Sequence, residues 1–140
     1  NTPIQLFCGI VSTFVPNLPS FNVAPELVSR DSSVVKDYSE DPLNLTSRVP
    51  LKTISELVNK VTKLPAQFPA LTLPMFIMHG SDDKLVPAAS SEILFEKVSS
   101  EDKELKIYPG FYHEILNELP TDRAQVVSDI CEWMLARFPS

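Results

Sequence analysis

Residues 74–87, with the sequence PMFIMHGSDDKLVP, constrain the fold of this chain more than any other stretch. Four consecutive apolar residues, 75–78, lie between a proline and Gly80, and Asp82 and Asp83 follow. A short unbroken apolar run of this kind is typical of a strand buried on both faces of a parallel sheet. In open α/β sheets, ligands and catalytic side chains gather beyond the carboxyl ends of the strands. The two aspartates are therefore candidate site residues.

A second short strand is predicted at residues 105–108, where Pro109 and Gly110 stop it. Between the two strands, residues 88–98 have helical periodicity. A strand, a helix and a strand of these lengths form a βαβ unit with parallel strands and a right-handed crossover. The carboxyl ends of both strands then lie at one edge of the sheet, so we expect His113 to lie close to the aspartates. The predicted fold class is α/β, with short parallel strands and flanking helices.

Helices are also predicted outside this unit. The first, at residues 3–15, is apolar on most faces, which predicts either burial against protein outside the chain or a lid that binds acyl chains and contacts a membrane peripherally. Residues 16–42 are rich in proline and predict loops and single helical turns, without a sheet. Residues 51–63 form an amphipathic stripe, and residues 122–138 form a last helix that packs on the sheet, capped by Thr121.

Composition excludes several classes of function. The chain has 140 residues, 44% of them hydrophobic, which is enough for one packed domain. Its formal net charge is -6, whereas a nucleic-acid-binding protein usually carries a positively charged surface, so no nucleic-acid partner is expected. Cys8 and Cys131 lie far apart without metal-ligand spacing and are predicted to be buried and unpaired. No apolar run approaches the roughly 18 residues of a membrane span, and no signal peptide opens the chain, which favours the cytoplasm without fixing the compartment.

The aspartates and one histidine fit a specific chemistry. An Asp and then a His, each just beyond a strand, occupy the second and third places of a Ser, Asp, His triad in the chain order of α/β-hydrolases. A neutral imidazole takes a proton from a serine hydroxyl and returns it to a leaving group, while the carboxylate fixes the ring tautomer. Of the two histidines, His113 lies in the loop where such a base is held. His79 belongs to the first strand and is predicted to be a packed or hydrogen-bonded strand-end residue.

Several motifs give the chain a family resemblance. The runs GSDDKLVP at 80–87, YPG at 108–110 and YHE at 112–114 resemble the end of a monoacylglycerol lipase-like serine hydrolase, a branch of the α/β-hydrolase family. Upstream, SRD at 29–31 and DPL at 41–43 resemble the cap segment of the same branch, whose members include lysophospholipases and caffeoylshikimate-type esterases. The resemblance covers nearly the whole chain, but only the C-terminal half of the family's fold.

The resemblance implies roles for particular residues. In the family's Gly-x-x-Asp pattern the catalytic acid is the third residue after Gly80, which is Asp83. Asp82 is then expected to be solvated or bonded within its loop. His113 takes the place of the catalytic histidine. After position 43 the family's usual histidine is replaced by Asn44, which separates this cap from the family pattern.

The resemblance also implies an organisation and a function. Residues 1–63 are expected to form a helical cap or lid with its return helix, and residues 64–140 the C-terminal part of the hydrolase core, entered through an extended proline-containing linker. The expected function is hydrolysis of a carboxylic ester, acylglycerol- or lysophospholipid-like. The implied partners are a small-molecule ester or lipid substrate and the missing N-terminal half of the hydrolase.

The nucleophile of such a reaction is not found in the sequence. A Gly-x-Ser-x-Gly elbow needs two glycines four positions apart because its tight turn leaves no room for Cβ atoms. The glycines are Gly9, Gly80 and Gly110, and no pair fits. The nucleophile is therefore expected outside the chain, and the chain alone is expected to be inactive. A competing interpretation is a non-catalytic binding or interaction fragment with an α/β-hydrolase-like fold.

Neither a metal nor a cofactor is expected. His113 and Glu114 begin a pattern like the zinc-binding His-Glu-x-x-His helix, but Asn117 occupies the place of the second histidine. Asp82 and Asp83 resemble a strand-end magnesium site, but no glycine-rich phosphate loop accompanies them.

Overall fold

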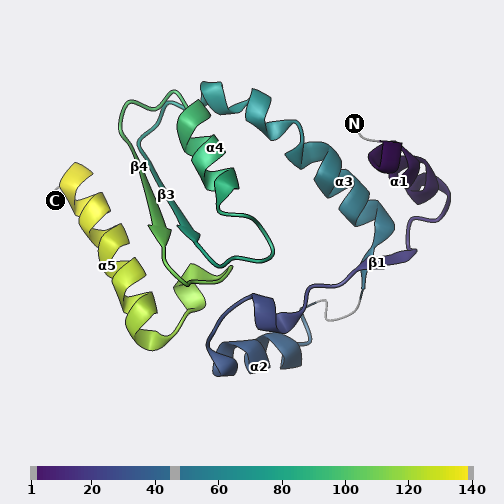
Figure 1. Cartoon of the computed structure of the whole chain (residues 1–140), viewed down its shortest axis with the longest axis horizontal. Coiled ribbons are helices and arrows are strands. Elements are labelled where there is room, and N and C mark those ends of the chain that lie inside the picture. The colour runs from purple at the N-terminus through teal and green to yellow at the C-terminus, as the bar shows by residue number, and fades with distance from the viewer. Residues whose placement is uncertain (1–2, 45–47, 139–140) are drawn as a thin grey trace.

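The computed structural model describes residues 3–44 and 48–138, and Figure 1 shows how their elements are arranged. In chain order the helices and strands are α1 (Pro3–Phe14), β1 (Pro19–Phe21), α2 (Ser32–Glu40), β2 (Val49–Pro50), α3 (Leu51–Val61), β3 (Met75–Gly80), α4 (Ala89–Lys97), β4 (Lys103–Tyr108) and α5 (Pro120–Arg137), with 3₁₀ turns at Pro25–Leu27, Leu64–Ala66, Phe68–Ala70 and Ile115–Asn117. The fold class is α/β, as predicted.

Two parallel strands form the centre of the C-terminal part. β3 and β4 pair from Met75 opposite Lys103 to Gly80 opposite Tyr108. α4 joins them and lies on one side of the pair, while α5 lies on the other (Figure 1). The βαβ unit predicted from the sequence is confirmed. β3 buries only Ile77 and Gly80, fewer residues than its apolar run predicted, because no strand among the described residues covers its second edge.

Alternation of side chains along the strands divides their contacts between the two helices. Toward α5, Phe76 stacks on Trp133 with ring centroids 5.8 Å apart. Tyr108 joins Phe111 and Val126 in the buried core on the same side. This packing fixes the end of β4 and the loop that follows it.

The opposite face of the strand pair meets α4. Ile77 is buried there, and the Lys103 ammonium donates hydrogen bonds to the carbonyl oxygens of Phe95 at 2.7 Å and Val98 at 2.9 Å. A cation at these carbonyls satisfies the acceptors that a helix leaves free at its C-terminus. Lys103 therefore ties the end of α4 to the start of β4.

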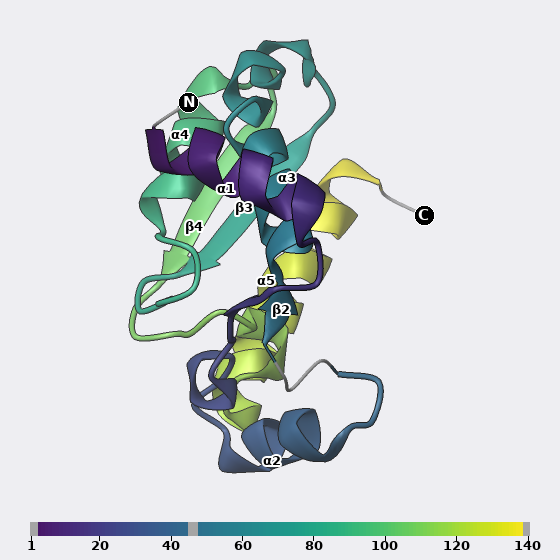
Figure 2. The same cartoon turned by 90° about the vertical axis from the view of Figure 1, so that its right-hand side faces the viewer.

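The N-terminal part is helical, with one short strand pair. α1 packs across α3 (Figure 2), and β1 pairs antiparallel with β2. Asp31 caps α2 by accepting a hydrogen bond from the Ser33 amide at 2.9 Å. The amphipathic helix predicted at residues 51–63 is confirmed as α3.

The apolar surface of α1 is open among the described residues. Phe7, Ile10 and Phe14 are 67%, 54% and 81% exposed. Burial against further protein and a role as a lid therefore both stay predictions. No helix in the described part of the chain combines the length and the apolar character that crossing a membrane requires.

Several local predictions were wrong. Residues 16–42 were expected to lack a sheet, yet β1 pairs with β2, with partners 28 to 31 positions apart in the chain. Ser20 Oγ also donates to the Val49 carbonyl at 2.7 Å. α2 is a helix of nine residues rather than a single turn. The linker before β3 contains two 3₁₀ turns instead of being extended, because the fixed φ of proline also suits the start of such turns, where Pro65 and Pro69 lie.

Two further predictions about single residues were wrong. α5 begins at Pro120, one residue before Thr121, and has no side-chain cap, because proline already supplies a helical φ at the first position. Cys131 is exposed and Cys8 half-buried, although both thiols are free as expected. Cys131 lies on the solvent side of α5, where a single small apolar residue is readily tolerated.

Candidate active site

The end of β3 is packed against the loop that follows β4. A Cβ atom at Gly80 would collide with the carbonyl oxygens of Phe111 and Tyr112, so only glycine allows this approach. The Asp82 amide then donates to the Phe111 carbonyl at 2.9 Å. Because of this contact, the residues after β3 and the residues after β4 lie side by side.

Asp83 is buried at this edge and accepts hydrogen bonds on both carboxylate oxygens. Its Oδ1 accepts from the amides of Leu85 at 2.8 Å and Val86 at 2.9 Å. Its Oδ2 lies 2.8 Å from His113 Nδ1, and its side chain is 1% exposed. Burial raises the pKa of the Asp83 carboxyl, but hydrogen bonds from the Val86 amide, from His113 and from the Leu85 amide outweigh it, and the pKa lies below its ordinary value. Asp83 is therefore an anion at neutral pH.

His113 is brought to Asp83 by the turn after β4. Gly110 adopts a left-handed conformation with φ of 78°, which favours glycine, and reverses the chain there. A carboxylate oxygen only accepts, so His113 Nδ1 carries the proton of the bond to Asp83. Its Nε2 has no hydrogen-bond partner among the described residues, and the side chain is 38% exposed. This nitrogen is free to accept a proton from a group that approaches from outside.

The loop that carries His113 is held by the segment before α2. The Glu114 amide donates to the Val28 carbonyl at 2.8 Å, and Ser29 Oγ donates to the Asn117 carbonyl at 2.7 Å. These bonds join positions more than 80 residues apart in the chain, so the cap-like segment and the His113 loop are built as one unit.

A buried ion pair strengthens the same junction. Glu118 is fully buried, and its carboxylate accepts from Arg30 Nε at 2.8 Å and from the Tyr112 amide. Arg30 also pairs with Asp122 and lies over the Phe111 ring, 4.8 Å from its centroid. Desolvation lowers the pKa of Arg30, but its hydrogen bonds to Asp122 and Glu118 outweigh this and raise it. The backbone directly before His113 is therefore fixed by a charged network.

His79 is hydrogen-bonded at the strand end, as predicted, but its partners include the site itself. Its Nε2 lies 3.0 Å from Asp83 Oδ2 and 2.9 Å from the Val86 carbonyl, and its Nδ1 lies 2.7 Å from Ser91 Oγ. The one sequence feature that could have predicted the contact between His79 and Asp83 is their spacing of four residues across the end of the strand. No feature of the sequence predicted that Ser91 would contact His79.

The Asp82 side chain has its hydrogen bond within its own loop. It is exposed, and its Oδ1 accepts from Ser81 Oγ at 2.9 Å, which agrees with the expected loop-bonded position. Within residues 3–44 and 48–138, no group of three or more His, Cys, Asp or Glu side chains is placed to hold a metal ion. Asn117, at the place of a second zinc ligand, instead donates to Glu114 at 2.9 Å.

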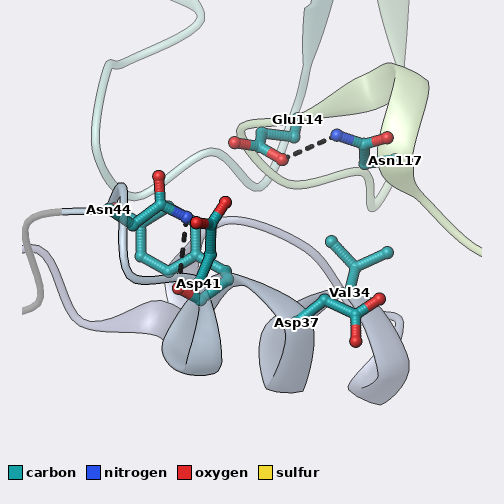
Figure 3. A pocket seen from close by; sticks show the side chains of 7 residues that line it. Val34, Asp37, Asp41, Asn44, Glu114 and Asn117 are labelled. Carbon is teal, nitrogen blue, oxygen red and sulfur yellow. Dashed lines mark hydrogen bonds between the residues drawn. The ribbon is translucent and has the colours of Figure 1, made fainter.

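An open pocket of about 370 Å³ lies between α2 and the His113 loop. It is lined by Val34, Asp37, Tyr38, Asp41, Asn44, Glu114 and Asn117. Figure 3 shows Glu114 and Asn117 on one side, facing the residues of α2 and of the turn after it. The side-chain amide of Asn44 donates to the Tyr38 carbonyl at 3.2 Å. Three carboxylates give this pocket a negative lining.

Comparison with known proteins places the chain in a family. Residues 1–120 match the family described as "Serine aminopeptidase, S33". The monoacylglycerol lipase of Mycolicibacterium smegmatis is 35% identical over 92% of this chain and 45% of its own length, and the monoglyceride lipase of Rattus norvegicus is 32% identical over 95% and 44%. The crystal structure of Paleococcus ferrophilus monoacylglycerol lipase superposes with a TM-score of 0.82 and 26% identity, over 97% of this chain and 52% of that one.

The chain spans about half the length of the relatives that it matches. Its α/β architecture corresponds to one part of their fold, and the family match covers the residues from α1 to the start of α5. On these grounds the chain belongs to the serine aminopeptidase S33 family of α/β-hydrolases and is a monoacylglycerol lipase-like member of it.

Proposed function

We propose that this chain is the cap and C-terminal core of a carboxylic ester hydrolase that acts on acylglycerol- or lysophospholipid-like substrates. In this proposal residues 1–63 form the cap or lid with its return helix, residues 64–140 form the C-terminal part of the core, and the nucleophilic serine lies outside the chain. Support comes from the relatives, which are named as lipases, and from the pairing of Asp83 with His113.

One observation carries the proposal. His113 Nδ1 lies 2.8 Å from the buried Asp83 Oδ2, while Nε2 is left without a partner among the described residues. A general base needs this asymmetry: one ring nitrogen is fixed by a carboxylate, and the other is free to meet the nucleophile.

The reaction that follows has two halves. His113 Nε2 removes the proton from the serine hydroxyl as that oxygen attacks the ester carbonyl, and the imidazolium then gives this proton to the departing alcohol. Water next attacks the acyl-serine ester by the same route, which releases the carboxylic acid and restores the hydroxyl. In both halves Asp83 holds the ring orientation and stabilises the imidazolium without taking the proton.

Separate stretches of the chain supply the two site residues. Asp83 stands on the tight loop fixed by the amides of Leu85 and Val86, and His113 stands on the loop fixed by Glu118. Both loops are therefore set before a substrate binds, which favours a low cost of reorganisation in the transition state.

The experiment begins with the transcript that encodes the chain, read upstream of Asn1. The upstream part of the reading frame is expected to encode a strand followed by Gly-x-Ser-x-Gly. The protein that includes this upstream part should hydrolyse 1-monooleoylglycerol or lysophosphatidylcholine and react with a fluorophosphonate probe. The 140-residue chain alone should do neither.

Variants then assign the roles. His113→Ala and Asp83→Asn are each expected to lower kcat about 10³- to 10⁴-fold. Asp82→Asn removes a neighbouring, exposed carboxylate and is the matched control, with an expected change of less than about threefold. Hydrolysis that survives His113→Ala or Asp83→Asn within a few-fold would refute the assignment. If the fluorophosphonate probe labelled the 140-residue chain alone, the proposal that the nucleophilic serine lies outside the chain would be refuted. If the upstream sequence encoded no Gly-x-Ser-x-Gly motif, the remaining interpretation would be a non-catalytic binding fragment.

A further inference from the structure

Asp83 Oδ2 is shared by two histidines. His113 Nδ1 lies 2.8 Å from it and His79 Nε2 lies 3.0 Å from it. His79 projects from β3 toward α4, where Ser91 Oγ lies 2.7 Å from its Nδ1. Figure 1 shows α4 beside β3 on this side of the strand pair. Ser91 is buried and the His79 side chain is 13% exposed, so a continuous line of polar groups, Ser91 to His79 to Asp83, runs under the candidate site.

The partners of His79 determine which of its nitrogens carries the proton. Its Nε2 faces the carboxylate of Asp83 and the carbonyl of Val86, at 3.0 Å and 2.9 Å, and both groups only accept. Nε2 must therefore be protonated and donate. The neutral ring then has a lone pair on Nδ1, which accepts the hydroxyl proton of Ser91. His79 and His113 are thus assigned opposite tautomers, Nε2–H and Nδ1–H.

The donors around Asp83 fill its acceptor sites. The amides of Leu85 and Val86 donate to Oδ1, and the two histidines donate to Oδ2. Four donors match the roughly four lone-pair positions of a carboxylate. His79 is the one donor of the four that belongs to the rigid strand, because the other three lie on loops. Without it, Oδ2 keeps His113 as its single partner, and only the two loop amides on Oδ1 still hold the carboxylate against rotation about its terminal bond.

From this arrangement we infer that His79 and Ser91 are positioning residues: Ser91 fixes the His79 ring, and His79 fixes the orientation of Asp83 Oδ2 toward His113. The inference rests on the proposed function for its catalytic meaning, while its geometric content concerns this chain alone. His79 touches neither the nucleophile nor the substrate in this scheme. It acts only through Asp83, which in turn selects the Nδ1–H tautomer of His113.

The test is a nitrogen-15 NMR measurement on the 140-residue chain, at a pH where an ordinary imidazole is neutral. Two histidines contribute four ring nitrogens, and long-range proton–nitrogen correlations report which nitrogen of each ring is protonated. The parent chain is expected to hold His79 as Nε2–H and His113 as Nδ1–H. The same tautomer for both rings would overturn the inference.

Three variants separate positioning from general structure. His79→Leu removes the donor, and the ratio of Nδ1–H to Nε2–H tautomers of His113 is expected to fall about two- to tenfold, the net worth of one hydrogen bond. His79→Gln places an amide donor near the position of Nε2 and is expected to restore the parent ratio. Ser91→Ala, the mildest change, is expected to move the Nδ1 signal of His79 and to shift the His113 ratio in the same direction, by less than His79→Leu.

Each outcome has one meaning. An unchanged His113 ratio in folded His79→Leu, or a His79→Gln chain that behaves like His79→Leu, would overturn the inference. If His79→Leu loses its dispersed amide spectrum, the Gln and Ser91→Ala variants still decide. In the protein with its upstream part, His79→Leu should lower kcat about tenfold with little change in KM. If that protein hydrolyses no ester while the tautomers behave as expected, the proposed function fails and the positioning of the carboxylate stands.

Discussion

Replacing Gly80 by alanine is expected to damage this protein more than the same change at either other glycine. Gly80 ends β3 opposite Tyr108, and the loop after β4 passes directly over it. A methyl group at this position would overlap the carbonyl oxygens of Phe111 and Tyr112. These are backbone atoms, which cannot rotate aside as a side chain can, so the segment directly before His113 must move.

The size of the effect follows from these contacts. Overpacking of a buried position costs up to about 3 kcal/mol. The displacement also breaks the hydrogen bond of 2.9 Å from the Asp82 amide to the Phe111 carbonyl, worth about 1 kcal/mol. The expected loss in the free energy of unfolding at Gly80→Ala is therefore about 3–4 kcal/mol. With a urea dependence of about 2 kcal/mol per molar, the unfolding midpoint moves down by about 1.5–2 M.

The fluorescence of Trp133 provides the assay. It is the single tryptophan of the chain, and its ring stacks on Phe76 of β3 at 5.8 Å between centroids. Unfolding in urea separates the two rings, so emission reports directly on the packing of α5 against the strand that ends in Gly80. In the protein with its upstream part, the same variant is expected to lose about 10²-fold in kcat, because His113 moves with the loop.

The other two glycines are matched controls for Gly80. A Cβ at Gly9 meets only Ser55 Oγ at 3.9 Å, an ordinary contact, and Gly9→Ala should stabilise α1 by about 0.5–1 kcal/mol. A Cβ at Gly110 meets nothing within 4 Å, so Gly110→Ala carries only the cost of a left-handed backbone, about 1–2 kcal/mol. A Gly80→Ala midpoint within about 0.3 M of Gly110→Ala would refute the reasoning from steric overlap.

Two more predictions concern the charged groups of the site. Glu118→Gln replaces the charged partner of Arg30 Nε by a neutral amide, while Arg30 keeps its ion pair with Asp122. The expected loss in the free energy of unfolding is about 1.5–3 kcal/mol, the range for a hydrogen bond between charged groups, and a urea midpoint equal to the parent's would contradict it. The pKa of Asp83 lies below its ordinary value in the folded chain, so its ionised form contributes stability above pH 3.8, and this contribution is lost as pH falls through the lowered pKa. The stability gap between the parent and Asp83→Asn should therefore narrow between about pH 4 and pH 2, and a gap independent of pH in urea titrations would argue against it.

Sequence reasoning worked where a pattern is local and periodic. The apolar run at 75–78, the helix after it and the second strand were predicted from such patterns, and parallel pairing follows from the length of the crossover. The proximity of Asp83 and His113 then needed only the rule that parallel strands end at one edge. Their catalytic roles stay predictions.

The predictions failed where distant residues decide the structure. β1 exists because its backbone meets β2 nearly 30 residues later, and no local propensity announces that pairing. The bond from Ser91 to His79 depends on the rotation of α4 over β3, which sequence spacing does not fix. The prolines before β3 predicted an extended linker, although the same fixed φ that excludes them from helix interiors suits the start of 3₁₀ turns.

The junction between residues 28–30 and the His113 loop also limits how such a protein can be recombined. Ser29 and Arg30 are bonded to Asn117 and Glu118 across the proposed boundary between cap and core, so these two cap residues belong mechanically to the core. If all of residues 1–63 are replaced by the cap of a relative, that cap must supply its own serine and arginine for the junction. If the replacement begins after Asp31, Ser29 and Arg30 are kept and the junction is unchanged. Because α1 and β1 pack on α3 and β2, any hinge by which the cap opens must bend at two places that spare this junction, one between β1 and Val28 and one between Asp31 and β3.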